Sequence, residues 1–151
     1  MPDNKCLFCS IANGDVPSYK IFEDNKYVAF LDIFPNIRGQ TLVVPKEHYD
    51  SYIFDLNDLQ ISDFFIAVKR VAVLLETGLG VGRVNMVLEG TGVNHLHAKL
   101  YPAIGMKEKG FREVIAKDTI YFEKYSGYVT TLMGPKASEA ELLALQREIL
   151  K

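Results

Sequence analysis

The chain has 151 residues, of which 48% are hydrophobic and 24% are charged, so it is long enough to bury the core of one globular domain. Seventeen Lys and Arg against nineteen Asp and Glu give a net charge of −2, which leaves no excess of cations for a nucleic-acid polymer or an anionic membrane surface. No apolar run reaches the length of a membrane helix and residues 1–5 lack the apolar core of a signal peptide, so we expect a cytoplasmic protein with no membrane partner.

The N-terminal half of the chain predicts short strands followed by one long helix. A helical or turn segment at residues 5–13 ends at Gly14, and segments rich in β-formers predict three strands, at residues 20–24, 27–33 and 41–44. Apolar residues then recur at threes and fours from about Leu56 to Thr77, with Gly78 directly after them. We therefore expect a long helix that ends just before Gly78.

The C-terminal half predicts further strands and a second helix. Residues 83–88 have a strand pattern, residues 89–92 form a Gly-rich turn, and another strand follows, so these two strands should pair antiparallel. A hairpin is expected further on, with strands at residues 119–122 and 128–132. Ser138 with Glu141 predicts the start of a terminal helix, whose apolar stripe could pack on its own domain or on a second subunit.

Together these patterns predict an α+β protein whose antiparallel sheet has about five strands. One long helix packs on that sheet, and a C-terminal helix follows. We place the main domain at residues 1–136 and the terminal helix at residues 137–151, where it belongs to the same domain or forms a dimer contact.

The stretch from Asn94 to Pro102 alternates apolar and polar residues. As a strand it would direct one set of side chains toward a core, namely Leu96, Ala98 and Leu100. The opposite face would carry His95, His97, Lys99 and Tyr101. A half-buried strand could carry these residues without any function, but two of the chain's three histidines lie here. Two imidazoles and an ammonium in a row therefore indicate an anion-binding site with a candidate nucleophile.

Both cysteines of the chain lie in one Cys-x-x-Cys pair, Cys6 and Cys9. Such a pair could be a redox couple, half of a metal site or two buried thiols. A redox pair usually accompanies a βαβ unit, which the strand order predicted here lacks. Zinc prefers thiolate and imidazole in a tetrahedral site, so two histidines would complete the ligand set.

The heptapeptide from His95 to Tyr101 resembles the signature of the histidine-triad (HIT) family, His-φ-His-φ-His-φ-φ with φ apolar, except that Lys99 replaces the third histidine. Three further segments recur in that family in the same order, at residues 6–9, 29–33 and 38–48. Four motifs in the right order are a strong signal, whereas one would be weak. The fold of this family is of the same α+β type.

The resemblance implies an enzyme that acts on nucleotides. In the family the middle histidine, here His97, attacks the α-phosphorus and forms a nucleotidyl-histidine, which water or another acceptor resolves. Such an attack requires a neutral imidazole with one nitrogen free and the other held by a hydrogen bond. Asp32 matches the carboxylate that binds the ribose hydroxyls, although Asp is also common in turns, and Phe30 and Ile33 match residues that flank the base. Candidates for phosphate contacts through backbone N–H groups are Thr91 and Gly92.

The wider HIT superfamily also implies a structural zinc site. Some bacterial members and the related galactose-1-phosphate uridylyltransferases combine a Cys-x-x-Cys pair, a histidine after the third strand and the first triad histidine. The matching residues of this chain are Cys6, Cys9, His48 and His95. Such a zinc would attach the N-terminal segment to the sheet beside the nucleophile.

Three departures from the family pattern affect the predicted chemistry. Lys99 binds phosphate well but is a poor proton relay at its ordinary pKa. Gln40, which we expect near the nucleotide, stands where many members have a histidine, and a neutral amide would suit a site in which Lys99 supplies the positive charge. Residues 89–93 lack the Gln-Ser pair that many members place on the phosphate, and Leu88 replaces a common asparagine. The uridylyltransferases also lack the third histidine, however, and keep a working middle one.

Two functions are therefore expected from the sequence. The first is a HIT-type nucleotidyl hydrolase or transferase that cleaves a phosphoramidate, a phosphate ester or a dinucleoside polyphosphate, with His97 and Lys99 as catalytic residues. The second is a zinc-stabilised protein that binds nucleotides such as AMP with little or no turnover. Family members often form homodimers, so a homodimer is a further expectation.

Overall fold

Most of the described structure lies in the first 107 residues. The computed structural model describes residues 6–107, 113, 115–127, 129, 138 and 140. Contacts divide the chain into two units, residues 1–111 and 112–151, and each is described by itself. In the second unit, Thr119 forms an isolated bridge. Three predictions lie outside the described residues and stay predictions, namely the strand at residues 128–132, the boundary after residue 136 and the terminal helix. Within these segments only single positions, such as Val129, are described.

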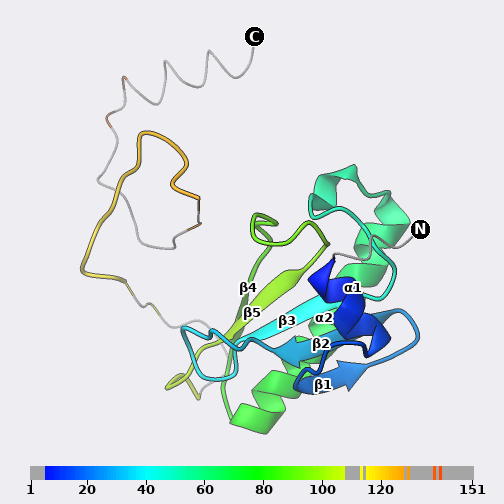
Figure 1. The fold of residues 1–151 in the computed structure, drawn as a ribbon. Coiled ribbons are helices and arrows are strands. Elements are labelled where there is room, and N and C mark those ends of the chain that lie inside the picture. The colour runs from blue at the N-terminus through cyan, green and yellow to red at the C-terminus, as the bar shows by residue number, and fades with distance from the viewer. Residues whose placement is uncertain are drawn as a thin grey trace. The chain divides into compact units, whose positions relative to one another are not determined.

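The first unit is built on a five-stranded antiparallel sheet with strand order β1-β2-β3-β5-β4 (Figure 1). The strands are β1 (Lys20–Glu23), β2 (Tyr27–Leu31), β3 (Thr41–Pro45), β4 (Val84–Val87) and β5 (Ala98–Pro102). The central strands β2 and β3 are almost fully buried, which explains why their sequences are runs of β-formers rather than alternating patterns. The predicted α+β class and the strand number are confirmed.

One face of the sheet is covered by the long helix α2 (Asp58–Leu79), which follows a short 3₁₀ turn at Ile53–Asp55 (Figure 1). The helix begins at a capping box, in which the Asn57 side chain accepts from the Gln60 N–H and the Gln60 side chain accepts from the Asn57 N–H. Its buried stripe packs against the apolar face of the β5 segment, and the buried members are Phe64, Ala67, Val68, Val71 and Leu75. No helix among the described residues has the length and hydropathy needed to cross a bilayer.

The predicted end of this helix is wrong by two residues. The helix continues through Gly78 to Leu79, and Gly80 is the residue that takes the left-handed conformation, with φ 63°. The Gly80 N–H then donates to the Glu76 carbonyl and closes the last turn. The sequence could not decide between the two positions, because Gly78 and Gly80 both follow the apolar stripe and either glycine could take the left-handed conformation that ends a helix.

The opposite face of the sheet is covered by the short helix α1 (Leu7–Asn13), which Figure 1 shows in front of the central strands. Phe8, Ile11 and Ala12 pack against β2 and β3 in a second buried cluster. Cys6 precedes the helix as its N-cap, with Sγ 3.5 Å from the Cys9 nitrogen, and Gly14 ends the helix with φ 85°. Both cysteines are therefore fixed at the start of α1.

The connection from β4 to β5 is longer than predicted. The strands pair antiparallel as expected, with Val87 opposite Lys99, but β5 begins only at Ala98, so residues 88–97 form a loop instead of a tight turn. The backbone of this loop bonds elsewhere, since the Leu96 N–H donates to the Tyr49 carbonyl at 2.9 Å. The predicted alternation holds nevertheless, because Leu96, Ala98 and Leu100 are at most 1% exposed on the α2 side.

Replacing Gly90 by alanine is expected to destabilise the protein by about 1–3 kcal/mol, because Gly90 has positive φ and lies close to another backbone segment. Its φ is +68°, and an added Cβ would lie 2.7 Å from the Ser51 carbonyl oxygen. Urea unfolding of this variant should be compared with that of Gly92→Ala, a neighbouring glycine whose Cβ would meet nothing within 4 Å. Equal stabilities of the two variants would contradict the expectation.

Candidate active site and metal centre

The imidazole of His97 is buried and held at one nitrogen. Its Nδ1 lies 2.7 Å from the His95 carbonyl oxygen, and because a carbonyl only accepts, Nδ1 carries the proton and Nε2 keeps a lone pair. The ring is 3% exposed and packs against Phe8 with 5.2 Å between ring centroids. Burial lowers the pKa of His97, so the ring is neutral at neutral pH. This is the arrangement that a nucleophilic imidazole requires.

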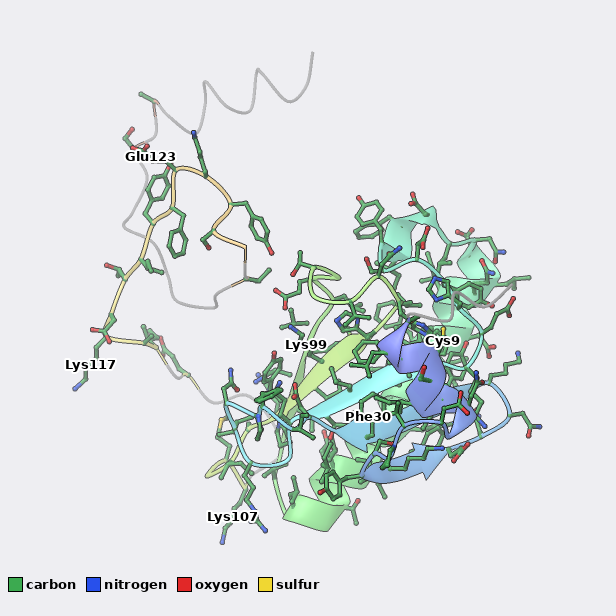
Figure 2. The ribbon with its side chains drawn as sticks, viewed as in Figure 1. Cys9, Phe30, Lys99, Lys107, Lys117 and Glu123 are labelled. Carbon is green, nitrogen blue, oxygen red and sulfur yellow. The ribbon has the colours of Figure 1, made fainter. Side chains whose placement is uncertain are left out.

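Lys99 lies beside the β4–β5 loop (Figure 2) and forms an ion pair with Glu89. The side chains are 25% and 11% exposed, respectively. Burial opposes the charge of Lys99, but the hydrogen bond and charge of Glu89 outweigh it and raise the pKa of Lys99. Glu89 was not among the site residues predicted from the sequence. The strand register places Glu89 two residues beyond Val87, which pairs with Lys99, but this register is known only from the structure.

Asp32 and Gln40 lie together in the loop between β2 and β3. The Gln40 amide donates to one oxygen of Asp32 at 2.6 Å, and the Phe34 N–H donates to the other at 2.8 Å. The side-chain oxygen of Gln40, Oε1, accepts from the Asn36 N–H at 2.9 Å. Gln40 is 5% exposed, and its side chain links Asn36 to the Asp32 carboxylate within this loop. The charge of Asp32 also raises the pKa of Lys99, after burial and the contributions of Glu89 and Tyr101.

The two predicted base-flanking residues lie in different surroundings. Phe30 is 4% exposed and packs edge-on against Phe8 in the α1 cluster, with ring centroids 5.9 Å apart. Ile33 is 69% exposed, and its neighbour Phe34, which the sequence analysis did not single out, is 85% exposed. An apolar surface for a ligand is therefore available at Ile33 and Phe34, whereas Phe30 belongs to the core cluster. Thr91 and Gly92, the predicted phosphate contacts, are exposed in the β4–β5 loop.

Four donor atoms converge where α1, the segment after β3 and the β4–β5 loop meet. One atom from each of Cys6, Cys9, His48 and His95 lies within 4.8 Å of all the others. Cys6 Sγ is 3.3 Å from His95 Nδ1, and Cys9 Sγ is 3.3 Å from His48 Nδ1 and 3.4 Å from His95 Nδ1. A tetrahedral ion with bonds of ~2.3 Å to sulfur and ~2.0 Å to nitrogen needs sulfur and nitrogen about 3.5 Å apart. These four residues could therefore hold a metal ion, and the donor set fits zinc chemistry.

Contacts around the four donors orient the two imidazoles. His95 Nε2 donates to the Pro45 carbonyl at 2.9 Å, which directs Nδ1 toward the thiols. Burial lowers the pKa of His95 to about 4, so this ring is neutral and ready to act as a ligand. Asp50 Oδ1 lies 3.6 Å from His48 Nε2 and accepts from the Asn94 amide at 2.8 Å. Asn94 thus connects the His48 side of the cluster with the loop that leads to His95.

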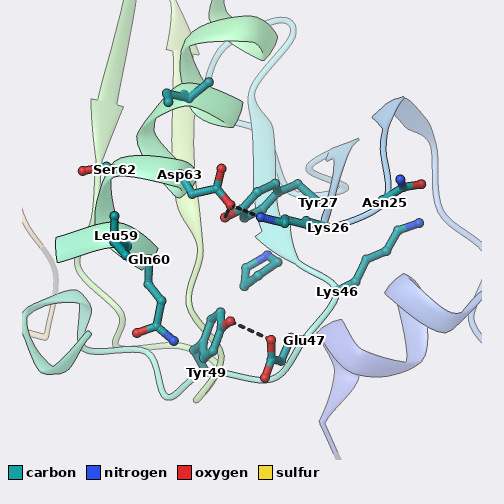
Figure 3. A pocket seen from close by; sticks show the side chains of 12 residues that line it. Asn25, Lys26, Tyr27, Lys46, Glu47, Tyr49, Leu59, Gln60, Ser62 and Asp63 are labelled. Atoms are coloured by element: carbon teal, nitrogen blue, oxygen red, sulfur yellow. Dashed lines mark hydrogen bonds and ion pairs between the residues drawn. The ribbon is translucent and has the colours of Figure 1, made fainter. Parts of the chain in front are cut away.

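A cavity of about 580 Å³ lies elsewhere, between the β2 and β3 ends and the start of α2 (Figure 3). Its polar side chains bond to one another, since Lys26 pairs with Asp63 at 2.6 Å and the Tyr49 hydroxyl donates to Glu47 at 2.7 Å. None of the predicted nucleotide or metal residues lines this cavity. The cavity is therefore separate from the site around His97.

Comparison with known proteins identifies the relatives of this chain. It is 36% identical to Protein hit of Bacillus subtilis over 114 residues, which cover 72% of this chain and 77% of that protein. It is also 36% identical to the adenosine 5'-monophosphoramidase hnt1 of Schizosaccharomyces pombe over 103 residues, 64% of this chain and 73% of that protein. The crystal structure of a Zn-bound histidine triad family protein from Mycobacterium smegmatis superposes with a TM-score of 0.62 at 29% identity, covering 73% of this chain and 83% of that one. Residues 13–103 match the model of the HIT domain, and this chain therefore belongs to the HIT family.

Proposed function

We propose that the protein is a HIT-type nucleotidyl hydrolase or transferase that attacks the α-phosphate of a nucleoside phosphate derivative through a covalent nucleotidyl-histidine. The observation that carries this proposal is the His97 imidazole, whose Nδ1–H donates to the His95 carbonyl and whose Nε2 keeps its lone pair. The similarity to a yeast adenosine 5'-monophosphoramidase supports an adenosine phosphoramidate as one substrate. Dinucleoside polyphosphates are the other candidate class.

The proposed reaction has two displacement steps at phosphorus. In the first, the Nε2 lone pair of His97 forms a bond to the α-phosphorus while the bond to the leaving nitrogen or oxygen breaks, and the leaving group takes that electron pair and a proton from solvent. In the second, water attacks the same phosphorus and gives up a proton to solvent, the P–Nε2 bond breaks with its electron pair returning to Nε2, and the nucleoside monophosphate is released. The His95 carbonyl stabilises the positive charge that the ring carries between the two steps.

The remaining residues would bind and orient the nucleotide. Each Asp32 oxygen accepts one hydrogen bond within the protein and has lone pairs left for the ribose hydroxyls. Gln40 would position Asp32 and so act on the ribose indirectly. Lys99 would face the phosphate, with the backbone N–H groups of Thr91 and Gly92 as further donors.

We also propose that Cys6, Cys9, His48 and His95 bind a structural zinc ion. The convergence of their donor atoms and the Zn-bound relative from Mycobacterium smegmatis support this assignment. When bound, zinc would join α1 to the loop that precedes β5, because two ligands come from the start of the chain and one from that loop. All four protein ligands would be used, which is typical of a structural rather than a catalytic site.

Trapping the covalent intermediate tests the enzymatic proposal. The protein is mixed with adenosine phosphoramidate for one turnover and quenched in alkaline denaturant, because bonds from phosphorus to imidazole hydrolyse in acid. Mass spectrometry should then detect an adenylyl group on the peptide that contains His97. Binding of AMP without any adduct or turnover would overturn the proposal and favour a nucleotide-binding protein.

A further inference from the structure

The peptide group between His95 and Leu96, which we call the anchoring peptide, is held at both ends. Its carbonyl accepts from His97 Nδ1 at 2.7 Å, and its N–H donates to the Tyr49 carbonyl at 2.9 Å. A trans peptide is planar and directs its C=O and N–H to opposite sides, so a bond at one end also fixes the direction of the other. The orientation of the His97 ring therefore depends on the position of the Tyr49 carbonyl.

The Tyr49 carbonyl belongs to residues 49–51, a segment that follows β3 and is neither helix nor strand. Two hydrogen bonds from the Asn94 side chain attach this segment to the β4–β5 loop. Asn94 Oδ1 accepts from the Ser51 N–H at 3.0 Å, and Asn94 Nδ2 donates to Asp50 Oδ1 at 2.8 Å. Because no strand pairing fixes the segment, these bonds help to determine where its carbonyl groups lie.

Asparagine at position 94 suits both bonds, because its amide offers an acceptor and a donor at the same end of a short side chain. The residue is exposed, so its side chain is not needed to fill the core. It also directly precedes His95 in the chain, which places its two bonds next to the anchoring peptide. The acceptor of Tyr49 is a backbone carbonyl and cannot be removed by substitution, so Asn94 is the residue through which this arrangement can be tested.

We propose that Asn94 is a positioning residue for the nucleophile. It holds residues 49–51 in place, so that the Tyr49 carbonyl fixes the anchoring peptide. That peptide in turn keeps the proton of His97 on Nδ1 and its lone pair on Nε2. The proposal rests on the proposed function of His97 and adds a residue that acts through the backbone and not on the substrate.

Replacing Asn94 by alanine should slow the formation of the adenylyl adduct on His97 by about 10-fold, because a nucleophile that is poorly oriented reaches the phosphorus less often. The affinity for AMP should stay within about twofold of wild type, since binding does not require this orientation. Single-turnover kinetics with adenosine phosphoramidate measure the rate, and calorimetry measures the affinity. An unchanged rate, or a loss confined to AMP affinity, would overturn the proposal.

The tautomer of His97 provides a second readout, which needs no turnover. In wild type labelled with nitrogen-15, NMR spectra should show the proton of His97 on Nδ1, and His97→Asn assigns this signal among the three histidines. Asn94→Ala should add a population protonated on Nε2, because the bond to the anchoring peptide selects the tautomer. A pure Nδ1–H tautomer in this variant would overturn the role of Asn94. Absence of turnover in wild type would instead refute the proposed function alone.

Two further variants test the bond between Asn94 and Asp50. Asn94→Asp keeps an acceptor for the Ser51 N–H but places a second carboxylate beside Asp50, so it should react at least as slowly as Asn94→Ala. The double variant Asp50→Asn/Asn94→Asp again sets an amide against a carboxylate at the net charge of wild type, and most of the rate should return. No recovery in a double variant that is folded and holds as much metal as wild type would overturn the proposal.

Asn57→Ala is the matched control. Asn57 is also an exposed asparagine whose Oδ1 accepts from a backbone N–H at 3.0 Å, that of Gln60, but it lies at the start of α2. This variant should lose comparable stability and keep the rate and the tautomer of wild type. Metal content is measured in every variant, because Asp50 Oδ1 lies 3.6 Å from His48 Nε2. Equal falls in rate in Asn57→Ala and Asn94→Ala would mean that stability alone matters, which would refute the role of Asn94.

Discussion

Replacing His97 by asparagine is expected to reduce the turnover of adenosine phosphoramidate by ~10⁴-fold or more, because the variant lacks the Nε2 nucleophile and with it the covalent route. Asparagine tests the nucleophile more cleanly than alanine does. Its side-chain amide can take over the hydrogen bond that Nδ1 donates to the His95 carbonyl at 2.7 Å, so the buried acceptor keeps a partner. Single-turnover kinetics with both variants measure the effect.

Binding and folding serve as the controls for this result. His97→Asn should retain the AMP affinity of wild type within a few-fold, because the proposed nucleotide contacts of Asp32 and of the β4–β5 loop are unchanged. His97→Ala should unfold at lower urea concentration, since it leaves a cavity beside Phe8 and an acceptor without its donor, at a cost of about 1–3 kcal/mol. Turnover within 10-fold of wild type in the asparagine variant would exclude His97 as the nucleophile.

Loss of the metal is expected to have the largest effect on stability. Elemental analysis should find one zinc per chain in wild type and none in Cys9→Ser, because Cys9 Sγ lies within 3.4 Å of both histidine donors and serine is a much weaker zinc ligand. If zinc binds only the folded chain and is present at ~1,000 times its Kd, its loss lowers the free energy of unfolding by about 4 kcal/mol.

A chelator separates metal loss from the substitution itself. Removing zinc from wild type should lower its melting temperature toward that of Cys9→Ser, while the same treatment should leave the variant unchanged, because it has no zinc to lose. Zinc retained by Cys9→Ser, or a wild type equally stable with and without chelator, would contradict a structural role for the site.

The alternation of apolar and polar residues in the β5 segment allowed the burial of its side chains to be predicted from the sequence. It correctly assigned Leu96, Ala98 and Leu100 to the core, because a period of two leaves little choice once one face is apolar. The Cys-x-x-Cys pair alone indicated half of a possible metal site, and His48 and His95 could be named as its partners only through the resemblance to the HIT superfamily. The structure brings two histidine nitrogens within 3.4 Å of the thiols, which supports the metal alternative more than the redox one.

The features that could not be predicted depend on the path of loops. Glu89 meets Lys99 only because the β4–β5 connection covers residues 88–97, and a tight turn over residues 89–92 would have directed it elsewhere. Likewise, Gln40 donates to Asp32 across a loop whose shape no local pattern determines. Neither bond follows from residue type alone, because each requires the position of a segment that is not regular.

The position of His95 has a practical consequence for anyone who purifies this protein. Its ring offers one nitrogen to the metal cluster and the other to Pro45, while its own carbonyl holds the ring of His97. A metal bound to the four proposed ligands would therefore fix His95 and, through the carbonyl of His95, the orientation of the proposed nucleophile His97. If zinc binds there as proposed, a preparation stripped of metal on a chelating resin or in a thiol-oxidising buffer is expected to lose activity although His97 is intact, and specific activity should then be given per metal-loaded chain.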